Sequence, residues 1–263
     1  MVSDLSIMGM IFSAFIAILV PVVLSIILYV RFRYRISFLL VGILAFVISQ
    51  GIRTALLLLL SSAEWYRNLS ENLLFAIFIG GVTAGLFEES ARYGGFHIQR
   101  KKQPQWADAV AFGIGHGGIE AILLVGLSQV SNLVLGYMIN SGMFDTQIAP
   151  ALGDQADIIR NQLVETSSEL FFISGMERIS AISLHIFLSV LVCLSVKNKK
   201  PLLLLLAVVL HTVFNTPAVF YAFGYLNIYV VEGLLALVGA VMLIGTICLK
   251  RRLDKQVNEM HIE

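Results

Sequence analysis

Ionisable side chains interrupt several long apolar stretches of this sequence. An ionisable group deep in a membrane costs at least about 2.5 to 3.5 kcal/mol, so it requires a partner, water or a function. Carboxylates and imidazoles are the groups that perform general acid–base chemistry and bind metal ions. The candidates of these two types are Glu88, Glu89, His116, His185 and His211. An active site inside a membrane is therefore the first hypothesis for this chain.

The positions of these residues along their helices predict a common depth. Glu88 and Glu89 precede the basic residue Arg100 by about 11 to 12 residues, or roughly 16 to 18 Å along a helix. The three histidines each lie about 10 to 12 residues from the nearest interfacial tryptophan or lysine. Four helices therefore present carboxylate or imidazole at nearly one level, as a shared site requires. The other two histidines, His97 and His261, are expected near the surface and in the C-terminal tail.

Helical spacing pairs several of these residues with a second polar group. Residues four apart share a helix face, and the pairs that result are Glu88 with Arg92, His116 with Glu120, and His211 with Asn215. The adjacent Glu88 and Glu89 point about 100° apart around the helix axis. We expect one of them to face the reaction centre and the other to hold Arg92. Glycines at the same spacing, Gly113 and Gly117, would let a neighbouring helix approach His116 closely.

The composition predicts a membrane protein that is entirely helical. Of 263 residues, 58% are hydrophobic and only 13% are charged, so a water-soluble fold could not cover its apolar surface. The expected fold is an all-α, polytopic transmembrane helix bundle that forms one integral membrane domain over residues 1–263. The seven segments long enough to span are about 7–30, 36–60, 73–97, 107–138, 177–196, 201–222 and 226–249. The catalytic helices would lie within 73–138 and 177–222.

Basic residues predict the orientation of these spans. They cluster after spans one, three, five and seven, at Arg31, Arg33, Arg35, Arg100, Lys101, Lys102, Lys197, Lys199, Lys200, Lys250, Arg251, Arg252 and Lys255. The positive-inside rule then places the N-terminus outside and the C-terminus in the cytoplasm, as for a multi-pass protein of a bacterial plasma membrane. A net charge of +1 argues against a nucleic-acid partner.

The remaining segments have simpler expectations. The first stretch, 7–30, is longer than a signal-peptide core and lacks a cleavage pattern, so we expect it to remain as a transmembrane helix. Segment 140–176 carries apolar residues among polar ones and predicts an interfacial amphipathic helix, either a lid or substrate rest or a solvated connector. Cys193 and Cys248 each lie in an apolar run, so we expect neither a disulfide nor a redox site.

Three motifs resemble those of the CAAX-protease and bacteriocin-processing superfamily of intramembrane peptidases. They read Glu88-Glu89-x-x-Arg92, Phe112-x-x-x-His116 and His211-x-x-x-Asn215, and the added Glu120 and His185 make the chain most similar to the YhfC-type membrane peptidases. The resemblance covers spans three to six. It implies that Glu88 or Glu89 activates water, and that the histidines and Asn215 complete the site and stabilise the oxyanion. The arginine follows the glutamates after two residues, where the prenyl endopeptidases have three, so their substrate preference is not carried over.

The function expected is hydrolysis of a peptide bond in a membrane-embedded or lipidated substrate, with membrane lipid as the surroundings. The catalytic candidates are Glu88, Glu89, Arg92, His116, His211 and Asn215. If zinc is the cofactor, its candidate ligands are His116, Glu120, His185 and His211. A metal-free glutamate mechanism uses the same side chains, and no His-Glu-x-x-His motif decides between the two.

Two other functions remain open at this point. A proton-coupled transporter or channel would also place Glu, His and Arg at mid-membrane, although this chain lacks the paired repeats typical of transporters. A haem-binding electron carrier would use two of the histidines as axial ligands. His185 alone is explained equally well as a packing residue, and Gln50 and Arg53 in the second span are interpreted as structural.

Overall fold

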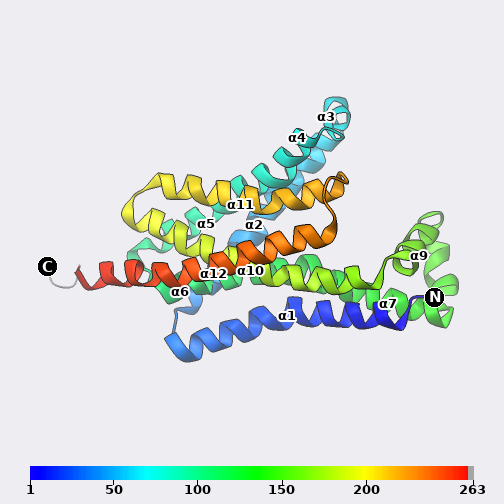
Figure 1. Ribbon diagram of the computed structural model, residues 1–263, viewed down its shortest axis with the longest axis horizontal. Coiled ribbons are helices and arrows are strands. Elements are labelled where there is room, and N and C mark those ends of the chain that lie inside the picture. Colours follow the sequence, from blue (N-terminus) through cyan, green and yellow to red (C-terminus); the bar gives the residue numbers. More distant parts are fainter. Residues whose placement is uncertain (260–263) are drawn as a thin grey trace.

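A computed structural model describes residues 1–259, with side chains through residue 254 (Figure 1). His261 and the side chain of Lys255 therefore lie outside the described residues. Every regular element in the described range is a helix. The order is α1 (Asp4–Phe32), α2 (Ile36–Ser61), α3 (Glu64–Leu69), α4 (Leu73–Ile77), η1 (Phe78–Val82), α5 (Thr83–Gln99), η2 (Arg100–Lys102), α6 (Trp106–Ala121), η3 (Ile122–Gly126), α7 (Leu127–Ser141), η4 (Phe144–Ile148), α8 (Ala149–Leu152), α9 (Gln155–Glu165), α10 (Ser168–Asn198), α11 (Pro201–Ala222) and α12 (Ile228–Glu259).

Seven of the helical runs in the described residues are long and apolar enough to cross a membrane, which confirms the predicted fold class. Two spans combine several elements: α4, η1, α5 and η2 form Leu73–Lys102, and α6, η3 and α7 form Trp106–Ser141. The π-helical turns η1 and η3 lie inside these two spans, near the residues of interest. Such turns occur often at functional sites because they locally change the direction of side chains.

The fifth span begins at Ser168, earlier than the predicted residue 177. The added turns continue as helix because Phe171 is buried against α1, where the Ser13 hydroxyl donates to its carbonyl. Gly175 in the same stretch approaches the Ser13 backbone so closely that a β-carbon would lie 2.7 Å from its Cα. Packing on α1 therefore extends this helix beyond its most apolar part.

Helix α10 is the centre of the bundle. It packs against α1, α5, α6, α11 and α12, and nearly all of its most apolar stretch is buried, whereas only a minority of the corresponding stretch is buried in each of the other six spans. The outward side chains of those spans are large and apolar, as at Leu58, Leu59 and Ile247. A lipid environment is the solvent that such a surface requires.

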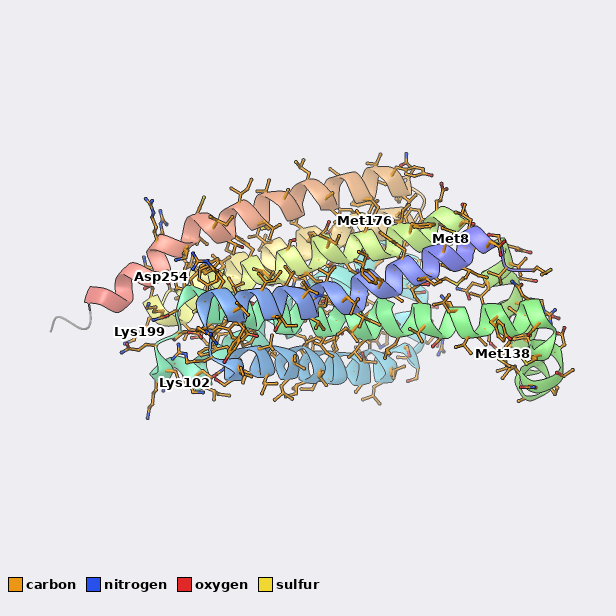
Figure 2. The ribbon with its side chains drawn as sticks, turned by 90° about the horizontal axis from the view of Figure 1, so that it is seen from below. Met8, Lys102, Met138, Met176, Lys199 and Asp254 are labelled. Carbon is orange, nitrogen blue, oxygen red and sulfur yellow. The ribbon has the colours of Figure 1, made fainter. Side chains whose placement is uncertain are left out.

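The basic clusters gather at one end of the bundle. Figure 2 shows Lys102, Lys199 and Asp254 at this end and Met8 and Met138 at the other. The clusters are also joined by contacts, because Lys197 donates to the carbonyl of Leu253 at 2.9 Å. The direction of the bundle in the membrane stays a prediction from the positive-inside rule.

The segment between the fourth and fifth spans contains the predicted amphipathic helix as α9. Its residues Ala156 and Leu163 are buried in a small hydrophobic cluster with Val2 and Phe144, while Ile158 is exposed. The helix thus packs on the N-terminal end of the bundle. Leu170 and Phe171, which the sequence placed in this segment, belong to α10 instead. A role of α9 as a lid or substrate rest stays a prediction.

Candidate active site

Four spans bring their ionisable residues together in the interior of the bundle. α5 carries the two glutamates and Arg92, α6 carries His116, α10 carries His185, and α11 carries His211. None of these six residues is more than 3% exposed. The His116 and His185 rings lie 4.9 Å apart between centroids, and the His185 and His211 rings lie 5.3 Å apart. The common depth inferred from the sequence therefore corresponds to direct contact in space.

Close helix packing makes this contact possible. A β-carbon on Gly113 would lie 2.4 Å from the Cα of Ile186, and one on Gly117 would lie 2.9 Å from the Cβ of His185. Both distances are shorter than side chains tolerate, so α6 and α10 can approach this closely only with glycine at these positions. Phe112 of α6 also stacks on Phe96 of α5, with ring centroids 4.4 Å apart.

Glu88 faces the histidines. Its Oε2 atom lies 3.0 Å from Nε2 of His116 and 3.9 Å from Nε2 of His211. Its Oε1 atom accepts a hydrogen bond of 2.6 Å from the amide of Gln50. The two oxygens therefore differ, because one is held by α2 and the other points at two imidazoles.

Glu89 contacts Arg92 and His211. Its Oε2 atom lies 2.9 Å from Nε of Arg92, and its Oε1 atom lies 2.9 Å from Nδ1 of His211. The sequence left open which glutamate contacts Arg92, and in the structure it is Glu89, three residues before the arginine. Glu88 makes no ion pair with Arg92 among the described residues because its carboxylate turns toward α2 and α6.

Arg92 also determines how His185 is oriented. Its guanidinium donates to the carbonyl of His185 at 2.9 Å, to the ring atom Nδ1 of His185 at 2.9 Å, and to the hydroxyl of Ser189. An arginine has only donors, so Nδ1 of His185 must accept. In the neutral ring the proton then sits on Nε2, which lies 2.6 Å from Oε2 of Glu120.

Glu120 is directed differently from the prediction. Its spacing in α6 pairs it with His116, but in the structure it contacts His185 and, at 3.3 Å, Arg178 of α10. Arg178 also forms an ion pair with Glu177. A side chain on one helix face can turn to a neighbouring helix, and here α10 provides two partners.

Asn215 lies one turn beyond His211 on α11 and is half-buried. Among the described residues, no hydrogen bond joins it to the cluster. The predicted role of Asn215 in the site therefore stays a prediction.

Two contacts from the second span were missed in the sequence. Gln50, interpreted there as structural, donates to Glu88. Arg53 fixes the orientation of that amide, because Nη1 of Arg53 donates to Oε1 of Gln50 at 3.3 Å. Arg53 is itself bound to the hydroxyl of Thr83 and the carbonyl of Ile79, in and beside the π-helical turn η1. The sequence signal that could have revealed these contacts was the presence of two long polar side chains, Gln50 and Arg53, three residues apart inside an apolar stretch.

Comparison with known proteins identifies the family. A family model described as "YhfC intramembrane metalloprotease" matches residues 16–236, which include every residue of the cluster. The chain belongs to this family. It is 43% identical over 174 residues to the "Uncharacterized membrane protein YhfC" of Bacillus subtilis (strain 168), an alignment that covers 65% of this chain and 67% of the relative. No solved structure matches the chain.

The name of the YhfC family implies a metal ion, and the buried cluster has donors that fit one. Ligand atoms of Glu88, His116 and His185 all lie within 4.8 Å of one another. A metal-binding histidine also needs an acceptor or space for the N–H on its other nitrogen. His211 meets this condition because its Nδ1 faces Glu89, whereas Nδ1 of His116 is buried and has no hydrogen-bond partner among the described residues.

His185 meets this condition poorly, because its Nδ1 faces the donors of Arg92. The distances thus group His185 with Glu88 and His116, whereas hydrogen bonding disfavours His185 and leaves His211, whose Nε2 lies 3.9 Å from Oε2 of Glu88, as the alternative histidine. Glu120 is engaged by His185 and Arg178. The sequence had included both His185 and Glu120 among the candidate ligands.

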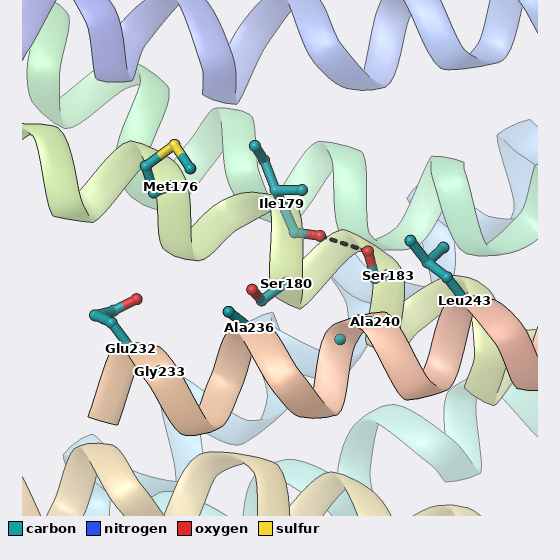
Figure 3. Close-up of a pocket in the computed structure, with 10 residues that line it drawn as sticks. Met176, Ile179, Ser180, Ser183, Glu232, Gly233, Ala236, Ala240 and Leu243 are labelled. Atoms are coloured by element: carbon teal, nitrogen blue, oxygen red, sulfur yellow. Dashed lines mark hydrogen bonds between the residues drawn. The ribbon is translucent and has the colours of Figure 1, made fainter. Parts of the chain in front are cut away.

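A groove of about 450 Å³ lies between α10 and α12, apart from this cluster (Figure 3). Small residues such as Ser180, Ala236 and Gly239 line it, with Glu232 at one end. None of the clustered glutamates or histidines lines the groove. The buried cluster, rather than this groove, is the candidate active site.

Proposed function

We propose that this protein is an intramembrane peptidase that hydrolyses a peptide bond of a membrane-embedded or lipidated substrate. The observation that supports it best is the contact of one buried carboxylate, Glu88, with the Nε2 atoms of two imidazoles. A purely structural cluster would have to stabilise two buried carboxylates and three histidines without any functional gain. The family name supports the class of reaction, and the residue roles below are our proposal.

Glu88 is proposed as the general base. Its Oε2 atom would accept a proton from a water molecule positioned by His116 and His211, and the resulting hydroxide would attack the peptide carbonyl. The hydrogen bond from Gln50 holds the other oxygen, so the carboxylate presents one defined atom to the water. Glu89 would not take part in proton transfer, because its oxygens are held by Arg92 and His211.

His185 and Asn215 are proposed to stabilise the oxyanion. Arg92 leaves the proton of His185 on Nε2, which lies 2.6 Å from Oε2 of Glu120, so His185 would exchange this carboxylate for the oxyanion when it donates. Asn215 would add an amide donor once the substrate is bound, as the resemblance to the CAAX-protease and bacteriocin-processing superfamily implies. Donors fixed in a site without bulk water stabilise negative charge more strongly than donors in water.

A zinc ion, if bound, would be held by His116, His211 and Glu88 and would polarise the carbonyl and acidify a bound water. Glu89 would then orient His211 through Nδ1. The metal-free version uses the same side chains, with Glu88 as the base. Metal analysis of purified protein beside an activity measurement distinguishes the two versions.

We also propose the wider context of this activity. From the resemblance of the three motifs we infer membership of the CAAX-protease and bacteriocin-processing superfamily, and from the four basic clusters we infer that the C-terminus lies in the cytoplasm of a bacterial cell. The whole chain would act as one integral membrane domain, because α10 contacts helices from both halves of the sequence. The direct contacts of the histidine rings disfavour the haem carrier, since a porphyrin would have to separate them.

The test of the proposal is cleavage of transmembrane and lipidated peptides by protein reconstituted in liposomes. Glu88→Gln, His116→Ala and His211→Ala should each lower cleavage by at least about 100-fold, the range lost with a general base. Glu232→Gln is the matched control, because it neutralises a glutamate in a span outside the cluster. Full cleavage by the cluster variants would remove the catalytic assignment, and proton-coupled solute uptake that depends on Glu88 would favour a transporter instead.

A further inference from the structure

A polar cavity of about 490 Å³ opens at the basic end of the bundle, and none of the clustered glutamates or histidines lines it. It lies between the loop that joins α1 to α2 and the turn that joins η2 to α6. Four cations line it, namely Arg33, Arg35, Lys101 and Lys102, and Asp108 is the single carboxylate of the lining. The volume falls within the roughly 300 to 1,000 Å³ of typical small-ligand sites.

The single carboxylate is fully engaged in holding the cavity wall. Asp108 forms an ion pair with Arg35 and accepts a hydrogen bond of 2.9 Å from the backbone N–H of Gln105. Arg35 also donates to the carbonyls of Lys102 and Gln103, which ties the two loops together. Asp108 and Arg35 therefore shape the wall, and neither is available to neutralise the other cations.

Two of the cations are left for a ligand. Arg33 and Lys101 are exposed, and neither forms an ion pair with a carboxylate within residues 1–254. Lys102 is bound only to neutral oxygens, those of Ser37 at 3.0 Å and Gln99 at 3.1 Å. The cavity thus carries an excess of positive charge that an anion would compensate.

The backbone of both loops is held in an uncommon conformation at this cavity. Arg33 has a φ of 52° and Gln103 a φ of 48°, in the left-handed region that favours glycine. Residues other than glycine persist there when surrounding contacts determine the backbone, a situation that often occurs at ligand clamps. The loops therefore present their side chains to the cavity from a defined backbone.

An apolar groove lies next to this cavity. Tyr34 lines the polar cavity, and its hydroxyl lies 2.8 Å from the hydroxyl of Ser25, which lines the groove. The groove runs between α1, α2 and α6 and is lined by apolar residues such as Val22, Ile26 and Leu39. A polar, cationic cavity beside an apolar groove matches a ligand with an anionic head and an acyl chain.

We propose that this cavity binds the phosphate of an anionic phospholipid, with Arg33 and Lys101 contacting the phosphate and an acyl chain in the apolar groove. Soluble phosphate would bind the same cations but has no acyl chain to fill the groove. The presence of the groove therefore favours the lipid. The proposal is independent of the peptidase activity, because none of the clustered glutamates or histidines lines either space.

The natural reporter for this site is Trp106. Its ring packs against Phe32, a residue of the cavity lining, at 5.4 Å, and Trp65 is the second of the two tryptophans. The Trp65→Phe protein therefore has one tryptophan, beside the cavity. In liposomes of phosphatidylcholine with increasing brominated phosphatidylglycerol or brominated phosphatidylcholine, quenching of Trp106 gives the relative binding constant of the anionic lipid.

We expect phosphatidylglycerol to be preferred over phosphatidylcholine, and Arg33→Gln with Lys101→Gln to lower this preference about 25-fold, or roughly fivefold for each charge removed. The matched control is Lys199→Gln with Lys200→Gln, which removes two charges at the same end without touching the cavity lining. Both pairs are exposed, so the variants should fold, and near-identical melting temperatures would verify it. An equal loss in both double variants would show diffuse surface attraction and overturn the proposal.

A second arm separates the two sources of phosphate. Inorganic phosphate is added to the protein in phosphatidylcholine nanodiscs, and the melting temperature is measured. A negligible shift at millimolar phosphate, together with the lipid preference, supports the phospholipid. Stabilisation by phosphate that is lost in the Arg33→Gln and Lys101→Gln variant, without any preference for phosphatidylglycerol, would overturn the lipid and assign the cavity to a soluble phosphate.

Discussion

Gln50 offers a sharp test of how the buried site is organised, because it contacts Glu88 from a helix that carries none of the sequence motifs. The substitution Gln50→Leu keeps a side chain of similar size but removes the 2.6 Å hydrogen bond to Oε1 of Glu88. A hydrogen bond to a charged group contributes about 1.5 to 3 kcal/mol. If the carboxylate loses this support in the transition state, kcat should fall about 10- to 150-fold.

The change should affect kcat rather than KM, since Gln50 holds the base and is not proposed to bind substrate. The assay is cleavage of a reconstituted transmembrane peptide at several substrate concentrations. Gln129→Leu is the matched control. Gln129 is also a buried amide, but it donates to Ser174 at 3.0 Å and forms no hydrogen bond with a residue of the cluster. Equal losses in both variants, or a kcat within twofold of the native value for Gln50→Leu, would refute the proposed role.

A double-mutant cycle tests the order of the contacts. Arg53 reaches Glu88 through the amide of Gln50, to which it donates at 3.3 Å. Arg53→Met added to Gln50→Leu should therefore cost little further activity, whereas Arg53→Met alone should cost part of the same loss. Fully additive losses would mean that Arg53 acts on the site by a separate route.

Three further predictions concern the supporting residues. Glu89→Gln should weaken zinc binding about 10- to 100-fold in a chelator competition, since it loosens His211, and an unchanged affinity would exclude His211 as an oriented ligand. Arg92→Lys keeps the positive charge but loses the planar guanidinium that contacts both Glu89 and His185, so cleavage should fall while the protein still folds. Native cleavage activity in this variant would contradict the proposed role of the guanidinium. Gly113→Ala should lower the free energy of unfolding by about 1 to 3 kcal/mol, because its β-carbon would meet the Ile186 backbone, and an unchanged melting temperature would show that the helices can separate without cost.

Membrane architecture was largely readable from the sequence. Spans of about 20 apolar residues must be helical because lipid offers no hydrogen bonds to the backbone, so composition and length alone predicted the seven helices. The start of α10 was misplaced because hydropathy does not register the packing of Phe171 on α1. The depth of the clustered residues was also accessible, since a helix advances a constant distance per residue.

The partners of each side chain were decided only by the tertiary structure. Spacing placed Glu88 and Glu89 on different faces, but the neighbours of those faces determined that Glu89 pairs with Arg92 and that Glu88 meets His116. Glu120 turns to α10 rather than to His116 for the same reason.

Depth along a helix is a local property that the sequence carries by itself, and it was enough to select the residues of the candidate site. The direction in which a side chain points around its helix predicts a contact only when the neighbouring helices are known, because hydrogen bonds join specific atoms of adjacent helices. The contact between Gln50 and Glu88 is of this kind, since it depends on how α2 packs on α5 and on no motif in either helix.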